Sequence, residues 1–201
     1  MGLFYQKNID EFTKLAIWKI EEDEQFFMEK VPLHRTVTHP HKRLQHLAGR
    51  YLLQYLFPDF PISLIQIADT KKPFLEDEQY HFSISHCSNY AAVIVSENNR
   101  VGIDIEMPQT TALRIQHKFV NEQEYDDLTP QTVADFIQIW SAKEAVFKWY
   151  GLGNVDFKKH ILLSKNKTNH SSFSCSFVKM QVELNIYLES FESLQLSYIV
   201  H

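Results

Sequence analysis

Cysteine and long apolar runs are scarce in this 201-residue sequence, and each scarcity excludes a class of protein. Cys87 and Cys175 are the only cysteines, so neither a disulfide framework nor a cysteine-rich zinc site is expected. No apolar run approaches the ~20 residues that span a membrane. The N-terminus, Met-Gly-Leu-Phe-Tyr-Gln, lacks the basic-then-apolar pattern of a signal peptide. We therefore expect a cytoplasmic protein that does not act at a membrane.

A strong charge of one sign is also missing. The formal net charge is -5, and acidic and basic residues are interspersed, which gives no general electrostatic case for nucleic-acid binding. Any anion site must therefore be local. The chain is 44% hydrophobic and 13% aromatic, enough for a sizeable core in one domain or in two small halves.

The stretch from Trp140 to Gly151 is the most informative part of the sequence. Apolar residues at helical spacing precede it, namely Val133, Phe136, Ile137 and Trp140. The same helix face continues to Glu144 and Lys148, Gly151 is a natural stop, and Lys143 is expected on a flank. An ordinary Glu-Lys pair at i,i+4 is the simpler interpretation of this face.

A second group of acids follows in Arg100–Glu106, which reads as a strand. Asp104 and Glu106 are two residues apart, so they project from one face about 7 Å apart along the chain. Two such carboxylates repel each other unless a cation separates them, and Mg²⁺ prefers oxygen ligands of this kind. An exposed strand edge without a metal is the alternative interpretation.

Three stretches of the first half carry basic or polar candidates. Arg43 and Arg50 lie two turns apart on a predicted helix that ends near residue 57, where they can reach one anion or lie on a solvated face. Lys72 lies in a Lys-Lys-Pro loop. Ser85 and His86 end a strand predicted over residues 80–86, and a lone histidine there is more often structural than catalytic.

The two halves read alike, which predicts an α+β fold with an internal duplication. Residues 1–99 and 100–201 each contain a strand, a helical stretch, a long helix and then antiparallel strands, including strands at 62–68 in the first half and at 172–180, 181–189 and 193–200 in the second. Each half is a small, mainly antiparallel sheet packed on a long helix. Lys19 and Glu21 take the places of Asp104 and Glu106, so only the second half can hold a metal. We expect one active site at the seam of a pseudo-two-fold monomer.

Three motifs together resemble the phosphopantetheinyl transferase superfamily. They are Phe82-Ser-Ile-Ser-His86, Val101-Gly-Ile-Asp-Ile-Glu106 and Trp140-Ser-Ala-Lys-Glu-Ala-Val-Phe-Lys148, in this order and with these gaps. The chain looks most like the broad-specificity, surfactin-synthetase-activating class, whose members are single chains of two similar halves. Ser83, Cys87 and Gln45 depart from the family pattern, which affects the expected details of coenzyme A binding.

The resemblance implies a role for each candidate residue. Asp104, Glu106 and Glu144 look like magnesium ligands, with Glu144 also the choice of base, and Lys148 looks like a contact to the diphosphate. Further phosphate contacts to coenzyme A are implied for the residues of the first half, namely Arg43, Arg50, Lys72, Ser85 and His86. His86 and Lys148 would also offset charge on the phosphoryl oxygens.

The implied reaction is the transfer of phosphopantetheine from coenzyme A to a serine of an acyl or peptidyl carrier protein, releasing adenosine 3′,5′-bisphosphate. Two alternatives use part of the same residue set. A metal-dependent hydrolase of nucleotide diphosphates would need no carrier protein. A non-catalytic coenzyme A or carrier-binding module would dispense with the metal, and the intact acids argue against it. Fatty-acid, polyketide and peptide synthesis are equally compatible with the sequence.

Overall fold

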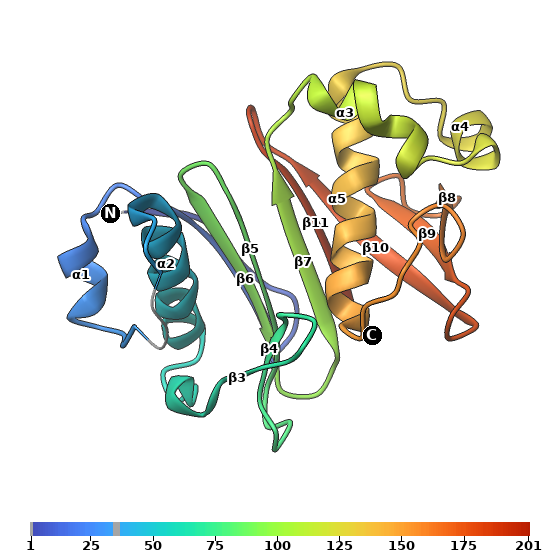
Figure 1. Ribbon diagram of the computed structural model, residues 1–201. Helices are drawn as coiled ribbons and strands as arrows, with labels where there is room; N and C mark the ends of the chain where they lie inside the picture. Colours follow the sequence, from blue (N-terminus) through green and yellow to red (C-terminus); the bar gives the residue numbers. More distant parts are fainter. Residues whose placement is uncertain (1, 34–36) are drawn as a thin grey trace. The chain divides into compact units, whose positions relative to one another are not determined.

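The computed structural model describes residues 2–33 and 37–201, and the chain forms two compact units, Met1–Val101 and Gly102–His201 (Figure 1). Each unit pairs a mainly antiparallel sheet with a long helix, which confirms the predicted α+β class. We predicted two halves, residues 1–99 with the coenzyme A contacts and residues 100–201 with the magnesium ligands. This assignment of ligands to the halves stays a prediction. None of the helices in the described ranges is long and apolar enough to cross a membrane.

The first unit is a four-stranded sheet in the order β1-β2-β6-β5, covered by α2. All three strand pairings are antiparallel, and β2 and β6 run in register from Thr13 opposite Ser96 to Lys19 opposite Tyr90. Its elements are β1 (Leu3–Asn8), β2 (Thr13–Lys19), α1 (Glu24–Met28), α2 (Pro40–Leu56), η1 (Ile62–Leu64), β3 (Gln66–Ile67), β4 (Pro73–Phe74), β5 (His81–Cys87) and β6 (Tyr90–Ser96).

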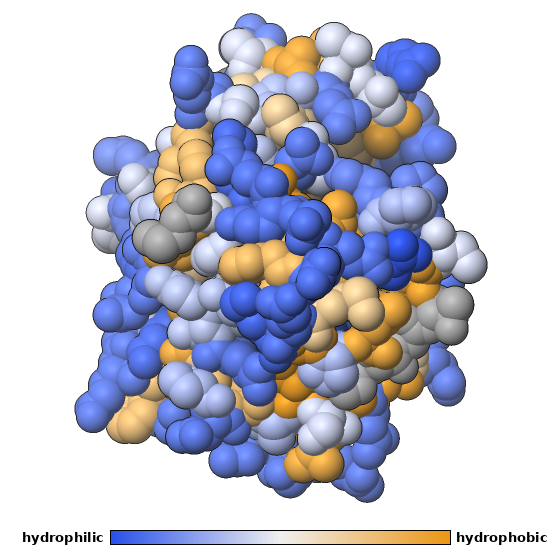
Figure 2. All heavy atoms as spheres, turned by 90° about the vertical axis from the view of Figure 1, so that its left-hand side faces the viewer, coloured by the Kyte–Doolittle hydropathy of each residue, from blue (hydrophilic) through white to orange (hydrophobic). Residues whose placement is uncertain are grey.

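The core of the first unit lies between α2 and the sheet. Pro40 opens α2 at its first turn, and the apolar face of the helix packs on β6 and β2. The buried core includes Trp18, Leu47, Leu52, Leu53, Phe82, Val93 and Val95. On the face drawn in Figure 2, hydrophilic residues predominate and apolar residues are visible between them.

The second unit is a five-stranded sheet in the order β7-β11-β10-β9-β8, with α5 packed on β11 and β10 (Figure 1). Its elements are β7 (Val101–Glu106), α3 (Thr111–Ile115), η2 (Gln116–Lys118), α4 (Glu122–Leu128), α5 (Val133–Tyr150), β8 (Ile161–Lys165), β9 (Ser172–Phe177), β10 (Val182–Ser190) and β11 (Gln195–Val200). Helix α5 starts at a capping box formed by Thr132 and Asp135 and ends, as predicted, at Gly151, whose φ is 74°.

The two units share a topology, which supports the predicted duplication. In each unit the strand that precedes the long helix lies beside the last strand, β2 beside β6 and β7 beside β11. The sheets differ at their outer edges, because the first unit adds β1 and the second adds β8 and β9. Lys19 and Glu21, at the positions that answer to Asp104 and Glu106, form an exposed ion pair with 2.6 Å between Nζ and Oε1.

One predicted strand is wrong. Residues 62–68 alternate apolar and polar side chains, yet they form the 3₁₀ turn η1 and then the two-residue strand β3. The turn forms because the Pro61 carbonyl accepts a hydrogen bond from the Leu64 amide at 3.0 Å, and the Phe60 carbonyl accepts one from the Ile62 amide at 2.9 Å. These local bonds use backbone groups that a longer strand would need. Strands β1 and β8 were not predicted at all.

Gly102 decides how closely α5 approaches β7. A Cβ at this position would collide with the Ala145 carbonyl oxygen and would lie 2.8 Å from the Trp149 nitrogen, so the helix backbone lies directly against the strand. Because backbone atoms cannot move aside as a side chain can, we expect Gly102→Ala to lower the free energy of unfolding by about 2–3 kcal/mol. Gly49→Ala in α2 is the control, since its Cβ would meet a side-chain methyl group of Ile84 at 2.9 Å and no backbone atom of another element. Equal denaturation midpoints for the two variants would contradict this account.

Candidate functional site

The acids of the second unit come together where α5 crosses β7. Asp104 is buried, with 3% of its surface exposed, and Glu106 and Glu144 are half-buried. The Lys148 ammonium lies 2.7 Å from Asp104 Oδ1 and keeps 26% of its side chain exposed. The Ser141 hydroxyl donates to the Asp104 carbonyl oxygen at 3.3 Å, which ties the strand to the helix. The structure thus brings all four predicted residues of this unit into one cluster.

The electrostatics of the cluster follow from burial and from the neighbouring charges. Burial raises the pKa of Glu106 to about 7, Asp104 and Glu144 add to this rise, and a hydrogen bond from Trp140 and the Lys148 charge oppose it. Burial, followed by Asp104, also raises the pKa of Glu144 to about 7, against Lys148. Three carboxylates with one ammonium form a site with an excess of negative charge. Such a site favours either protons or a cation.

A divalent cation fits this set by its chemistry. Hard cations such as Mg²⁺ take carboxylate oxygens, and here three carboxylates share one small region. Within residues 2–33 and 37–201, however, no group of three or more His, Cys, Asp or Glu side chains is already arranged as a metal cage. One reason is visible in the cluster, because Lys148 contacts the Asp104 oxygen that a cation would also approach. Binding a cation would require these side chains to rearrange and Lys148 to leave Asp104 Oδ1.

Three candidates of the first unit lie on β5 and on the loop between β3 and β4. Ser85 is buried and His86 is exposed, as successive residues of a strand point to opposite faces. Lys72 is half-buried, and its burial, followed by the charge of Arg100, lowers its pKa to about 8. The ammonium of Lys72 is therefore easier to deprotonate than an ordinary lysine. Their roles stay predictions.

The two arginines of α2 have partners within the first unit. Arg43 binds Glu24 through two hydrogen bonds, Nε to Oε1 at 2.6 Å and Nη2 to Oε2 at 2.7 Å. Arg50 is only 5% exposed, and its Nη1 lies 3.2 Å from His46 Nδ1. The sequence predicted both arginines on one helix face, where they could reach one anion or lie exposed to solvent. In the structure Arg43 is paired with an acidic residue, whereas Arg50 is buried. Their role in binding coenzyme A stays a prediction.

Sequence reasoning missed Lys143, which we expected on a flank of the helix. Its side chain is fully buried, and Nζ lies 2.6 Å from Glu124 Oε1. Burial lowers the pKa of Lys143, and Glu124 opposes this change. Nothing local in the sequence marks the residue as buried, because its partner lies on α4 and not on α5.

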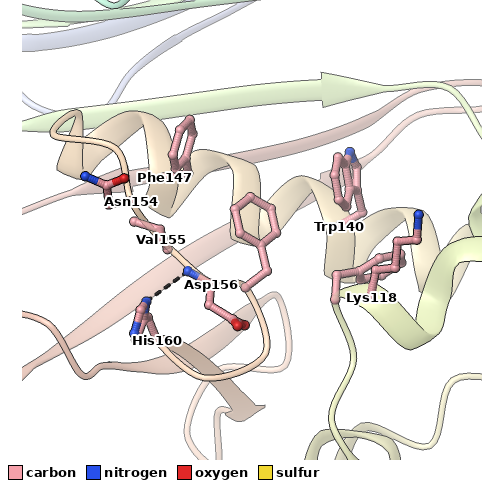
Figure 3. Close-up of a pocket in the computed structure, with 9 residues that line it drawn as sticks. Lys118, Trp140, Phe147, Asn154, Val155, Asp156 and His160 are labelled. Atoms are coloured by element: carbon pink, nitrogen blue, oxygen red, sulfur yellow. Dashed lines mark hydrogen bonds between the residues drawn. The ribbon is translucent and has the colours of Figure 1, made fainter. Parts of the chain in front are cut away.

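A cavity of about 680 Å³ beside α5, which is widely open to solvent, was also missed (Figure 3). It has an aromatic wall and a polar end, and its lining is Lys118, Phe119, Trp140, Phe147, Asn154, Val155, Asp156, Phe157 and His160. Trp140 belongs both to this lining and, through its hydrogen bond to Glu106, to the carboxylate cluster. The cavity therefore adjoins the cluster within the second unit.

The raised pKa of Glu144 predicts how metal-free protein responds to pH. A carboxyl group whose pKa is raised on folding stabilises the fold fully below its unfolded pKa, and this stability is lost as pH rises through about 7. Glu144→Gln mimics the protonated form. It should therefore raise the free energy of unfolding at pH 8 by about 1–2 kcal/mol after allowance for solvent screening, with little effect at pH 4.

Chemical denaturation of metal-free protein across this pH range measures the effect. Glu192→Gln, at an exposed turn residue, is the control and should change stability equally little at every pH. If Glu144→Gln were less stable than wild type at pH 8, the ionised Glu144 carboxylate would not destabilise the fold, and this account would be wrong.

Comparison with known proteins places this cluster in a family. Residues 100–199 match the family described as the 4′-phosphopantetheinyl transferase superfamily. The chain is 32% identical over 126 residues to the 4′-phosphopantetheinyl transferase gsp of Aneurinibacillus migulanus, covering 61% of this chain and 52% of that protein. It is 29% identical over 154 residues to a putative 4′-phosphopantetheinyl transferase of Haemophilus influenzae, covering 73% and 62%.

A further relative is the 4′-phosphopantetheinyl transferase AcpT of Escherichia coli, 28% identical over 146 residues, with 70% of this chain and 72% of that protein covered. The chain spans roughly half to two thirds of the length of the first two relatives. The match over residues 100–199 includes all four residues of the carboxylate cluster. This chain belongs to the 4′-phosphopantetheinyl transferase superfamily.

Proposed function

We propose that this protein transfers the phosphopantetheine group of coenzyme A to a serine hydroxyl of an acyl or peptidyl carrier protein, in a magnesium-dependent reaction. The observation that carries the proposal is the cluster of Asp104, Glu106 and Glu144 with Lys148 in a chain of this superfamily. We further propose that it acts as a cytoplasmic monomer of the broad-specificity, surfactin-synthetase-activating class, with its site at the seam of the two halves.

Asp104, Glu106 and Glu144 would hold the magnesium ion. When bound, the ion would neutralise charge on the diphosphate and hold it against the carboxylates. Lys148 is the positively charged residue of the cluster and is paired with Asp104. Its ammonium would contact the diphosphate oxygens. A lysine suits this role because its flexible stem lets the ammonium leave one oxygen for another.

The residues of the first unit would bind phosphate groups of coenzyme A. We assign this role to Lys72, Ser85 and His86. We also assign Arg43 and Arg50 to the adenosine end, where Arg43 would have to exchange its two bonds to Glu24 for a phosphate. His86 is exposed, so its imidazole is accessible to a ligand.

The reaction is a single displacement at phosphorus. The serine oxygen of the carrier protein forms a bond to the phosphorus that bears the pantetheine, and the bond from that phosphorus to the bridging oxygen breaks. Adenosine 3′,5′-bisphosphate leaves with the electron pair of the broken bond. Glu144 accepts the serine proton, and Lys148 with His86 offsets the charge that develops on the phosphoryl oxygens.

The cavity beside α5 is the place for the pantetheine arm. Trp140 lines this cavity and contributes a hydrogen bond to Glu106, so the cavity is close to the carboxylates that would hold the diphosphate. The arm has two amides and apolar carbons. These groups match a lining that combines aromatic side chains such as Phe147 and Trp140 with the polar side chains of Asn154 and His160 (Figure 3).

The reaction can be tested with labelled coenzyme A and a panel of apo carrier proteins. Wild-type protein with Mg²⁺ should label at least one carrier, and Asp104→Asn and Glu144→Gln should each lower kcat/KM by about 100-fold or more, because each removes a charged metal ligand. Glu192→Gln should retain full activity. Release of hydrolysed product without a carrier would favour the hydrolase, and coenzyme A binding without any reaction would favour the binding module.

A second prediction concerns the phosphate contacts. Lys72→Ala and His86→Ala should each weaken coenzyme A binding about 10-fold or more in calorimetry, since each removes a charge-assisted or polar contact to phosphate. Lys167→Ala and His170→Ala, at exposed positions of the second unit, are matched controls. Wild-type affinity should fall as pH rises through about 8, where Lys72 loses its proton, and this fall should be absent in Lys72→Ala. Unchanged affinity in both variants would remove these residues from the site.

A further inference from the structure

The Lys143 ammonium is saturated with protein acceptors. An ammonium has three donors. Here Nζ lies 2.6 Å from Glu124 Oε1 and donates to the carbonyl oxygens of Phe157 and Ile161, both at 2.8 Å. The side chain is fully buried, so these contacts form away from water. Lys143 therefore joins three segments, namely α5, α4 and the chain that leads into β8.

Glu124 is held equally firmly. Its Oε1 also accepts a hydrogen bond from the Leu163 amide at 2.8 Å, and its Oε2 accepts one from the Asn121 amide at 2.9 Å in the capping box of α4. A carboxylate fixed by two backbone amides has little freedom to follow a moving lysine. The pair therefore defines one position for the Lys143 ammonium.

One of the two carbonyl groups that Lys143 holds, that of Phe157, belongs to a residue that lines the cavity, and the other belongs to Ile161 at the start of β8. Phe157 lines the cavity, and its ring lies 5.4 Å from that of Trp140 and 5.9 Å from that of Phe147. The loop before it begins at Gly151 and contains Gly153, both with φ near 70°, so it follows a path that α5 cannot continue. The helix end fixes the start of the loop. Near Phe157 the Lys143 ammonium supplies a buried anchor, beside a longer contact of 3.3 Å from Asn121 Nδ2 to the Lys158 carbonyl oxygen.

We propose that Lys143 is a positioning residue for the transfer reaction, because its buried ammonium fixes the loop that carries Phe157 and so keeps the cavity open for the arm of coenzyme A. The inference rests on the proposed function. The three acceptors of the Lys143 ammonium lie outside the carboxylate cluster, so its effect on the reaction is indirect. Lys143 holds the Phe157 carbonyl, and this fixes the position of the Phe157 ring beside Trp140. Trp140 in turn has a hydrogen bond to Glu106 of the carboxylate cluster.

The test separates positioning from mere stability. Lys143→Met with Glu124→Gln removes both charges together, so no buried charge is left without its counterion, and the carbonyl contacts of the ammonium are lost. Lys179→Met is the matched control. Lys179 also donates to a carbonyl of this loop, that of Asn154 at 2.8 Å, but its side chain is exposed.

In the folded double variant we expect amide hydrogen exchange in residues 156–161 to become at least ~10-fold faster, because the anchor of the loop is gone. Coenzyme A should bind about 10-fold more weakly in calorimetry, whereas adenosine 3′,5′-bisphosphate, which lacks the arm, should bind as in wild type. The control should change none of these values. A purely structural role would weaken both ligands alike or neither.

Each result has a distinct meaning. Unchanged exchange, or equal effects on the two ligands, would overturn the positioning role. If that double variant does not fold, Lys143→Gln with Glu124→Gln also leaves no buried charge and keeps a donor for one carbonyl. It should show the same selective loss in smaller measure, and equal binding of both ligands in this variant would overturn the role. If wild type itself neither binds coenzyme A nor labels a carrier, the proposed function fails, and the exchange rates alone decide whether Lys143 anchors the loop.

Discussion

The direct contact of α5 with β7 is the constraint on which the candidate site depends. Without a Cβ at residue 102, the helix backbone lies against the strand, and Glu144 with Lys148 comes within reach of Asp104 and Glu106. A larger residue would push the helix away and separate the charges. One glycine thus sets both the packing of the second unit and the spacing of its acids.

The same contact brings three carboxylates together, and a single lysine only partly neutralises them. Half-burying Glu106 and Glu144 beside Asp104 raises their pKa values to about 7, and Lys148 compensates one charge among three. The first unit has no such problem at the equivalent positions, since Lys19 and Glu21 pair with each other at the surface. The duplicated topology therefore supplies one strained cluster and one neutral pair. A site under such strain is suited to a ligand that brings positive charge.

The parts predicted from sequence are those with local causes. The period of α5, its stop at Gly151 and the alternation in β7 placed Glu144, Lys148, Asp104 and Glu106 correctly on their elements. The parts that failed depend on distant partners. Lys143 is buried by Glu124 and by two loop carbonyls, and Arg43 is held by Glu24, and neither pairing leaves a periodic signal. The strand predicted over residues 62–68 failed because a proline-led turn outweighed alternation.

Lys143 and Lys148 show how one helix assigns opposite tasks to the same residue type. Five residues apart, they point about 140° away from each other around the helix axis. Lys143 faces α4 and the loop, where three acceptors saturate it and leave no donor for a ligand. Lys148 faces Asp104 and keeps part of its surface exposed, so its ammonium can exchange a carboxylate for a phosphate. A buried lysine with all donors satisfied can only hold the structure, whereas a partly exposed one beside surplus negative charge can take part in chemistry.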